Sequence, residues 1–353
     1  ALQLNDFCAI RDRHIADFSE LFGRVSFSLI EEKKETDIYD CLKRFDGTDL
    51  GLYELLFSYG RYLAISSSRP GTQVTNLQGI WNEKLLPPWS CCIVLNINMQ
   101  MNYWHMFNTN MAECFEPFIR FAEKLRENGR QTAVGYYGSG GFAVHHNTDI
   151  WGMTNPVGAN VGEFAVRYTF WTVSTGWIAC QLFSAYEYTA DRAVLERIYP
   201  IIRDAALFFA DTVYEDENGL IFVSPTTSPE NTYIRNGRET AVSKTAAMSQ
   251  SVLRELFENV LKASEILNIA DSLTERVKQM LPRIKPISLN ANGTLAEWSG
   301  NETESDAHHR HISHLYGLFP GNSISPELTP NLAEACRKTL EKRGDDGTGW
   351  SLA

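Results

Sequence analysis

A carboxylic acid in a polar turn is the first candidate for chemistry in this sequence. Glu230 lies in the segment Ser-Pro-Glu-Asn at 228–231. Such an acid can protonate a leaving oxygen if burial raises its pKa, and glycoside hydrolysis pairs it with a second group that activates water. Asp345 and Asp346, between two glycines, are candidates for the second carboxylate. From these segments alone, exposed turns are the simpler explanation of all three acids.

Two asparagines, Asn96 and Asn98, are candidates for holding a water molecule. If the backbone is extended there, a spacing of two residues directs both amides to one side. An amide is no general base, but its oxygen accepts a hydrogen bond from water when a carboxylate receives its N–H. Spacing alone favours the alternative that these residues cap a helix expected over 97–108.

The histidines cluster at 145–146 and 308–314, which raises the question of a metal site. The metalloprotease pattern HExxH is absent, and Arg310 within the second cluster would repel a dication. The sequence therefore predicts neither a catalytic metal nor another cofactor. Orienting a sugar hydroxyl or a carboxylate fits these histidines better, and satisfied core histidines are the remaining alternative.

Long helices must position these loops, because apolar residues recur at spacings of three and four while strand-like alternation is scarce. The expected helices span 6–22, 50–66, 97–108, 111–130, 167–189, 193–213, 244–267, 271–280 and 330–342. The segment 167–189 is apolar around nearly its whole circumference, which indicates burial. Short connections favour antiparallel helix pairs. The sequence thus predicts a single all-α domain over residues 1–353, a toroid of helix pairs with its loops gathered at one end.

The loops combine planar polar side chains with aromatic ones, as sugar binding requires. Sugar rings stack on tryptophan through their C–H faces, while amides, carboxylates, imidazoles and guanidinium groups bind the hydroxyls. Five of the eight tryptophans lie in or beside these loops: Trp81, Trp89, Trp104, Trp151 and Trp350. We expect these five to line a pocket. The other three, Trp171, Trp177 and Trp298, lie outside the motifs and are not expected to line it.

Composition excludes some partners. The 353 residues include 43 acidic and 32 basic side chains, a net charge of −11, which argues against nonspecific binding to nucleic acid. No apolar run approaches the ~18 residues of a membrane span. The chain starts at Ala1 without a readable export signal, so an extracellular, a periplasmic and a cytoplasmic location all remain open. Oligomeric state is likewise open.

Seven motifs, taken in order, resemble glycoside hydrolase family 95, the inverting α-L-fucosidases. They are Asn-Leu-Gln-Gly-Ile-Trp-Asn at 76–82, Pro-Pro-Trp at 87–89, Asn-Ile-Asn-x-Gln-Met-Asn-Tyr-Trp at 96–104, His-His-Asn-Thr-Asp-Ile-Trp at 145–151, Ser-Pro-Glu-Asn at 228–231, His-Arg-His-Ile-Ser-His-Leu at 309–315 and Gly-Asp-x-Gly-Thr-Gly-Trp-Ser at 344–351. The resemblance implies an (α/α)6 barrel. In full-length relatives a β-rich domain precedes it and a further region follows, so we expect an excised catalytic domain, truncated at its C-terminus.

The resemblance also implies residue roles. Glu230 would be the general acid. Asn98, with Asn96 beside it, would hold the nucleophilic water, and Asp345 would polarise that unit, with Asp346 as the alternative one residue away. Water attack opposite the leaving group inverts the anomeric centre.

Substrate binding is implied for a second group of residues. Arg310 and His311 would bind the sugar in the −1 subsite, and weaker candidates are His146, Asp149, Trp151 and Trp81. Val94, two residues before Asn96, stands where family members carry a His or a smaller polar residue. An apolar side chain is compatible with the methyl group of L-fucose, which favours L-fucose over L-galactose.

These observations predict an exo-acting enzyme that releases terminal, α-1,2-linked L-fucose from fucosylated oligosaccharides or glycoconjugates. Two alternatives stay open. One is an α-L-galactosidase on the same scaffold. The other is a catalytically silent glycan-binding domain.

Overall fold

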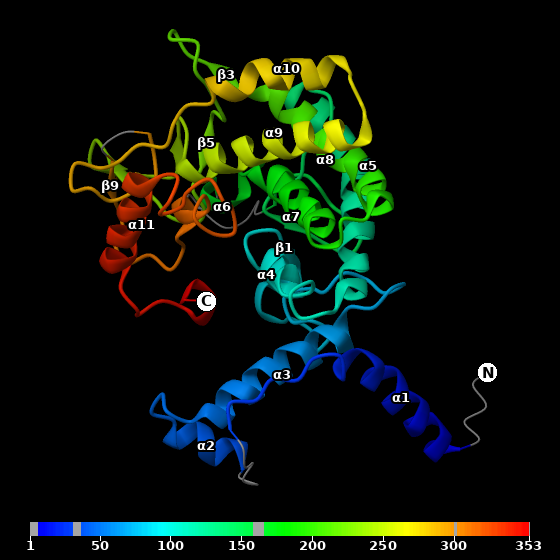
Figure 1. Cartoon of the computed structure of the whole chain (residues 1–353). Coiled ribbons are helices and arrows are strands. Elements are labelled where there is room, and N and C mark those ends of the chain that lie inside the picture. Colours follow the sequence, from blue (N-terminus) through cyan, green and yellow to red (C-terminus); the bar gives the residue numbers. More distant parts are fainter. Residues whose placement is uncertain (1–5, 31–36, 158–165, 300–301, 353) are drawn as a thin grey trace. The chain divides into compact units, whose positions relative to one another are not determined.

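A computed structural model describes residues 6–30, 37–157, 166–299 and 302–352 (Figure 1). They form two compact units. The first comprises the described residues of Ala1–Cys91 and Met101–Phe121, and the second those of Cys92–Gln100 and Ala122–Ala353. The single domain over 1–353 stays a prediction.

The first unit is built from helices whose starts are capped by aspartates. Its helices are α1 Phe7–Phe22, α2 Ile38–Arg44 and α3 Leu50–Ser67, with short 3-10 turns at Pro88–Cys91 and Ala112–Phe115. The Asp6 and Asp49 side chains accept hydrogen bonds from backbone N–H groups of the first turns of α1 and α3. Arg61 of α3 is buried and donates to the backbone carbonyls of Leu21 and Phe22, at the end of α1.

The second unit has a core of three helices. Its helices are α6 Val166–Thr169, α7 Val173–Thr189, α8 Arg192–Thr212, α9 Ala247–Leu267, α10 Ser272–Met280, α11 Pro330–Arg343 and α12 Gly349–Leu352. Helix α7 is buried along most of its length, as its apolar circumference predicts, and packs against α8 and α9. Gly176 allows that approach, because a Cβ there would lie 2.7 Å from Val252 Cγ1 on α9. Two more helices, α4 Asn98–Trp104 and α5 Glu116–Tyr137, continue from one unit into the other.

The strands are two or three residues long and antiparallel. They pair as β1 Ile93–Val94 with β2 Asn147–Thr148, β3 Tyr214–Glu215 with β4 Ile221–Phe222, β5 Thr226–Thr227 with β8 Val242–Ser243, and β6 Tyr233–Arg235 with both β7 Arg238–Thr240 and β9 Thr303–Glu304. Such short ladders fix loops rather than form a sheet core. The predicted all-α class is confirmed, and β1 and β5 lead directly into the loops of Asn96 and Glu230.

Several predicted helix boundaries are wrong. The helix expected over 97–108 ends at Trp104, that over 111–130 begins after a 3-10 turn and runs on to Tyr137, and that over 167–189 is divided into α6 and α7. Apolar periodicity reports which face is buried, and it continues across a break in the helical hydrogen bonds. Pro117 marks the true start of α5, since proline is tolerated in a first turn. Helix α2 was not expected at all. None of the helices in the described residues is long and apolar enough to cross a bilayer.

Candidate active site

The turn that carries Glu230 is fixed on both sides. It follows β5, and Asn231 N–H donates to Ser228 O at 2.9 Å to close the turn. From the histidine-rich segment, Ser313 Oγ donates to Pro229 O at 2.5 Å. This contact joins the 228–231 and 309–315 motifs.

Three predicted sugar-binding residues surround the Glu230 carboxylate. Arg310 Nη2 lies 2.5 Å from Oε2. His311 Nε2 lies 3.7 Å from Oε2, and His146 Nε2 lies 3.5 Å from Oε1. The Glu230 side chain is 18% exposed and that of Arg310 is 44% exposed, so the ion pair stands at the edge of solvent.

The pKa of Glu230 is lowered rather than raised, in contrast to the raised pKa expected of a buried general acid. Burial does raise the pKa of this carboxyl. The hydrogen bond with His146 and the charges of the three basic neighbours outweigh burial and lower the pKa of Glu230 to about 2. Burial also lowers the pKa of His311 to about 3, so this ring is neutral near pH 7. Glu230 is therefore ionised at neutral pH.

His146 connects Glu230 to the asparagine side of the site. Leu95 N–H donates to His146 O at 2.7 Å, beside the β1–β2 ladder. His146 Nε2 then lies 3.3 Å from Asn96 Nδ2, and both side chains are nearly inaccessible. A residue predicted as a weak sugar-binding candidate therefore lies between the predicted acid and one of the predicted water-holding amides.

Asn98 is the first residue of α4 and is half-buried, so the argument from an extended backbone does not apply to this pair. The capping alternative does not describe Asn96 either. Within the described residues its side chain bonds to His146 and to no helical N–H.

Asp345 and Asp346 are exposed residues just after α11. In the described part of the chain, neither forms a hydrogen bond or ion pair with Asn96 or Asn98. Their segment nonetheless reaches the site, because the Trp350 ring meets the His311 ring edge-on with 4.7 Å between centroids. The structure thus brings the motif to the site but leaves its carboxylates in solvent.

The remaining candidates have different surroundings. Asp149 Oδ1 accepts the N–H groups of Trp151 and Met153, at 2.9 and 3.1 Å, which makes it the stabiliser of a turn. Trp151 is 73% exposed. Val94 is buried in β1, opposite Asn147 of β2. Trp81 belongs to the first unit, where its ring lies 6.3 Å from that of Tyr62.

The tryptophans divide into two groups by exposure, while a pocket lined by them stays a prediction. Those outside the motifs are buried, namely Trp171, Trp177 and Trp298. Those within or beside the motifs are all partly or largely exposed, namely Trp81, Trp89, Trp104, Trp151 and Trp350.

The histidine clusters do not assemble a metal site within the described residues. No group of three or more His, Cys, Asp or Glu side chains that could hold a metal ion occurs there. Burial and the nearby Arg310 and Arg343 charges lower the pKa of His309 to about 4, so this ring is neutral near pH 7.

Sequence reasoning missed two residues, Glu297 and Arg343. Both side chains are almost completely buried, and Arg343 Nη2 donates to Glu297 Oε2 at 3.0 Å. Glu297 lies between Ala296 and Trp298, which are also buried. Those apolar neighbours were the available signal, and they do not distinguish a buried glutamate from a surface one.

Two curated proteins are similar to this chain along nearly its whole length. Alpha-L-fucosidase 2 of Arabidopsis thaliana is 38% identical over 361 residues, which cover 99% of this chain and 42% of that protein. Probable alpha-fucosidase A of Aspergillus niger is 30% identical over 367 residues, covering 98% of this chain and 44% of that protein. The chain therefore spans less than half the length of these two curated relatives. The family model of the glycosyl hydrolase family 95 catalytic domain matches residues 6–353. The ordered motifs, the helical architecture and this match together show that the chain belongs to glycosyl hydrolase family 95.

Proposed function

We propose that this chain is the catalytic domain of an inverting exo-glycosidase that releases terminal α-L-fucosyl residues, α-1,2-linked, from oligosaccharides or glycoconjugates. Family membership and the names of both relatives support the fucosidase activity. The observation that carries the proposal is the convergence of His146, Arg310 and His311 on Glu230, with Asn96 beyond His146.

Glu230 is the proposed general acid, and the ion pair with Arg310 must loosen before it acts. A carboxyl with a pKa of about 2 is ionised near neutral pH and has no proton to donate. Arg310 is the proposed ligand of a fucose hydroxyl, and its side chain is partly exposed to solvent. When the guanidinium leaves the carboxylate, one of the interactions that lower the pKa of Glu230 is removed and this pKa rises; the hydrogen bond with His146 must weaken as well for the acid to take up a proton.

The water side uses Asn98 and Asn96, with Asp345 as the carboxylate that polarises them and Asp346 as the alternative. Because both aspartates are exposed, the proposal includes an inward movement of the loop after α11 when substrate binds. Asp149, Trp151 and Trp81 remain proposed contacts of the sugar or the leaving group. Val94, buried and apolar, is the proposed neighbour of the fucose methyl group.

Hydrolysis of an α-1,2-fucosylated oligosaccharide tests this function, with Glu230→Gln as the diagnostic variant. Removing a general acid costs about 10²–10⁴-fold in rate. We expect a loss of that size, and the wild-type protein to release β-L-fucose first, as inversion requires. Faster cleavage of a matched α-L-galactoside would favour the galactosidase alternative. Binding of the oligosaccharide without turnover would overturn the proposal in favour of a silent glycan-binding domain.

A further inference from the structure

A buried carboxylate beneath the acid-bearing turn is the strongest feature that the proposed mechanism does not use. The Glu297 side chain is 1% exposed. Its Oε1 accepts from Ser228 Oγ at 2.7 Å, and its Oε2 accepts from Asn231 Nδ2 at 3.0 Å. These donors belong to the residues on either side of Pro229 and Glu230, so one carboxylate is hydrogen-bonded to both ends of the turn.

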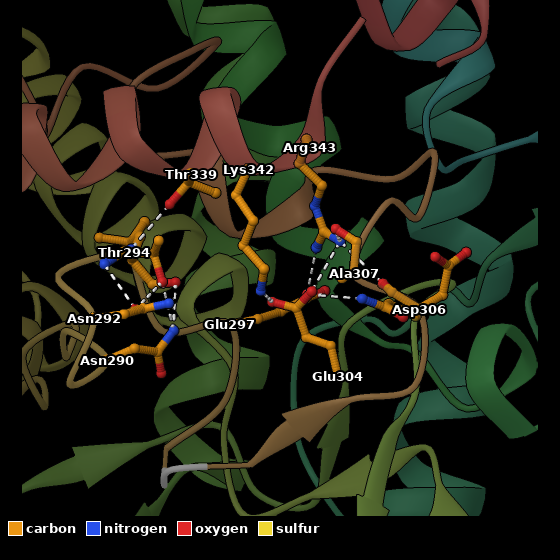
Figure 2. Close-up of polar contacts among 12 residues, drawn as sticks. Asn290, Asn292, Thr294, Glu297, Glu304, Asp306, Ala307, Thr339, Lys342 and Arg343 are labelled. Atoms are coloured by element: carbon orange, nitrogen blue, oxygen red, sulfur yellow. Dashed lines mark hydrogen bonds and ion pairs between the residues drawn. The ribbon is translucent and has the colours of Figure 1, made fainter. Parts of the chain in front are cut away.

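The same carboxylate is tied to α11 through Arg343. This arginine donates to Glu297 Oε2 and, through Nη1, to Glu304 Oε2, each at 3.0 Å (Figure 2). Nη1 also lies 3.1 Å from Asp306 O and 2.9 Å from Ala307 O. The guanidinium therefore joins the Glu297 carboxylate to the chain that leads into the histidine-rich segment.

Backbone contacts hold the base of this network. Ala247 N–H, at the start of α9, donates to Glu297 O at 3.0 Å, and Leu295 N–H donates to Thr339 Oγ1 of α11 at 2.9 Å. His308 Nδ1 lies 3.0 Å from Arg343 O. Glu297 is thus attached to α9 and α11, while the turn that it holds carries the proposed acid.

We propose that Glu297 is a positioning residue that holds the 228–231 turn so that the Glu230 carboxyl is aimed at the leaving oxygen. This inference rests on the proposed general-acid role of Glu230. The Glu297 side chain is buried and its oxygens accept from Ser228, Asn231 and Arg343, so it is not placed to touch the substrate. A displacement of about 1 Å in a reacting group costs on the order of 10²-fold in rate.

Glu297→Gln tests the positioning role, because it keeps the size of the side chain but turns one acceptor into a donor. Either the new amide N–H₂ faces the donors Asn231 and Arg343, or it turns toward Ser228 Oγ, which then loses its acceptor at position 297. We expect kcat on an α-1,2-fucosylated oligosaccharide to fall on the order of 10²-fold, with KM changed by less than about threefold. With a dinitrophenyl α-L-fucoside, whose leaving group departs without a proton, we expect kcat to stay within about threefold of wild type.

The control is Glu255→Gln. Glu255 lies on α9 and, like Glu297, has its pKa raised to about 7 by burial, but it faces Tyr316 and Cys180 rather than the turn. We expect this variant to keep wild-type kcat on both substrates. Equal losses of Glu297→Gln on both substrates, or a matching loss in Glu255→Gln, would overturn the positioning role in favour of general destabilisation.

Two further measurements keep the inference testable in other cases. If Glu297→Gln does not fold, Ser228→Ala removes the 2.7 Å contact alone and must show the same dependence on the leaving group.

If the wild-type protein cleaves no fucoside, the proposed function has failed. A carboxyl NMR titration then still decides whether Glu297 holds the turn that carries Glu230. Release of the turn should move Glu230 from its basic neighbours and raise its pKa toward about 4.3 in Glu297→Gln. An unchanged Glu230 titration would contradict it.

Discussion

The pKa of Glu230 is lowered, whereas burial alone would raise the pKa of a carboxyl. Three basic side chains converge on one carboxylate and, with burial opposing them, lower its pKa to about 2. In the proposed general-acid role, this carboxyl must regain a proton before it can act.

At the residue scale, Arg310→Gln should shift the pH dependence of kcat/KM. This profile reports ionisations of the free enzyme, and a general acid must be protonated to act, so activity falls as pH rises above its pKa. Removing the guanidinium raises the pKa of Glu230 from about 2, and we expect the alkaline decline of kcat/KM to move to higher pH. Arg238→Gln, at an exposed arginine on β7, is the control. A decline that stays at the wild-type pH would show that Arg310 does not set this ionisation.

At the element scale, the short strand pairs and the three packed helices have different structural roles. The pairs β1–β2 and β5–β8 place the segments before Asn96 and Glu230, while α7, α8 and α9 form the packed base. The close approach of these helices depends on Gly176, because Val252 Cγ1 and Phe209 Cε2 lie within 3.1 Å of the point that an alanine methyl group would occupy. The packing of these three helices therefore rests on a residue without a side chain.

Gly176→Ala should lower the free energy of unfolding. Alanine improves helix propensity by about 1 kcal/mol. Overpacking costs about 1–3 kcal/mol, and the contacting atoms belong to two other core helices, so the overpacking term dominates. Gly135→Ala in α5 is the matched control, because a Cβ there meets nothing within 4 Å, and it should stabilise by up to about 1 kcal/mol. Urea unfolding measures both variants; equal effects of the two would contradict the packing argument.

At the scale of the whole molecule, buried ionisable groups determine how stability responds to acid. Burial lowers the pKa of five histidines, namely His105, His145, His309, His311 and His314. It raises the pKa of three carboxyls, namely Glu255, Glu258 and Glu297. Below about pH 6.5 the unfolded chain protonates the histidines first, which destabilises the fold, while the folded chain protonates the raised carboxyls first, which opposes that effect.

The histidines outnumber the carboxyls, so the free energy of unfolding should decrease as pH falls from about 6.5 to 4.5, by about 1–3 kcal/mol per pH unit. Below about pH 4.5 the decrease should steepen. The pKa of Glu230 in the folded chain is about 2, so the unfolded chain protonates this carboxylate at a higher pH than the folded chain does. Denaturant unfolding at a series of pH values measures the slope. His145→Gln should reduce it and the exposed His14→Gln should not; a stability that rises on acidification would refute the prediction.

Sequence alone determined the helical class, most helix positions and the motifs of the site, because these depend on residues that are near neighbours along the chain. The tertiary structure decided the chemistry of those motifs. Glu230 meets Arg310 across 80 positions, Asn231 meets Glu297 across 66, and Glu297 meets Arg343 across 46. Burial and charge at such distances leave no local pattern, so the lowered pKa of Glu230, the turn-forming role of Asp149 and the network of Glu297 emerged only when the chain was folded.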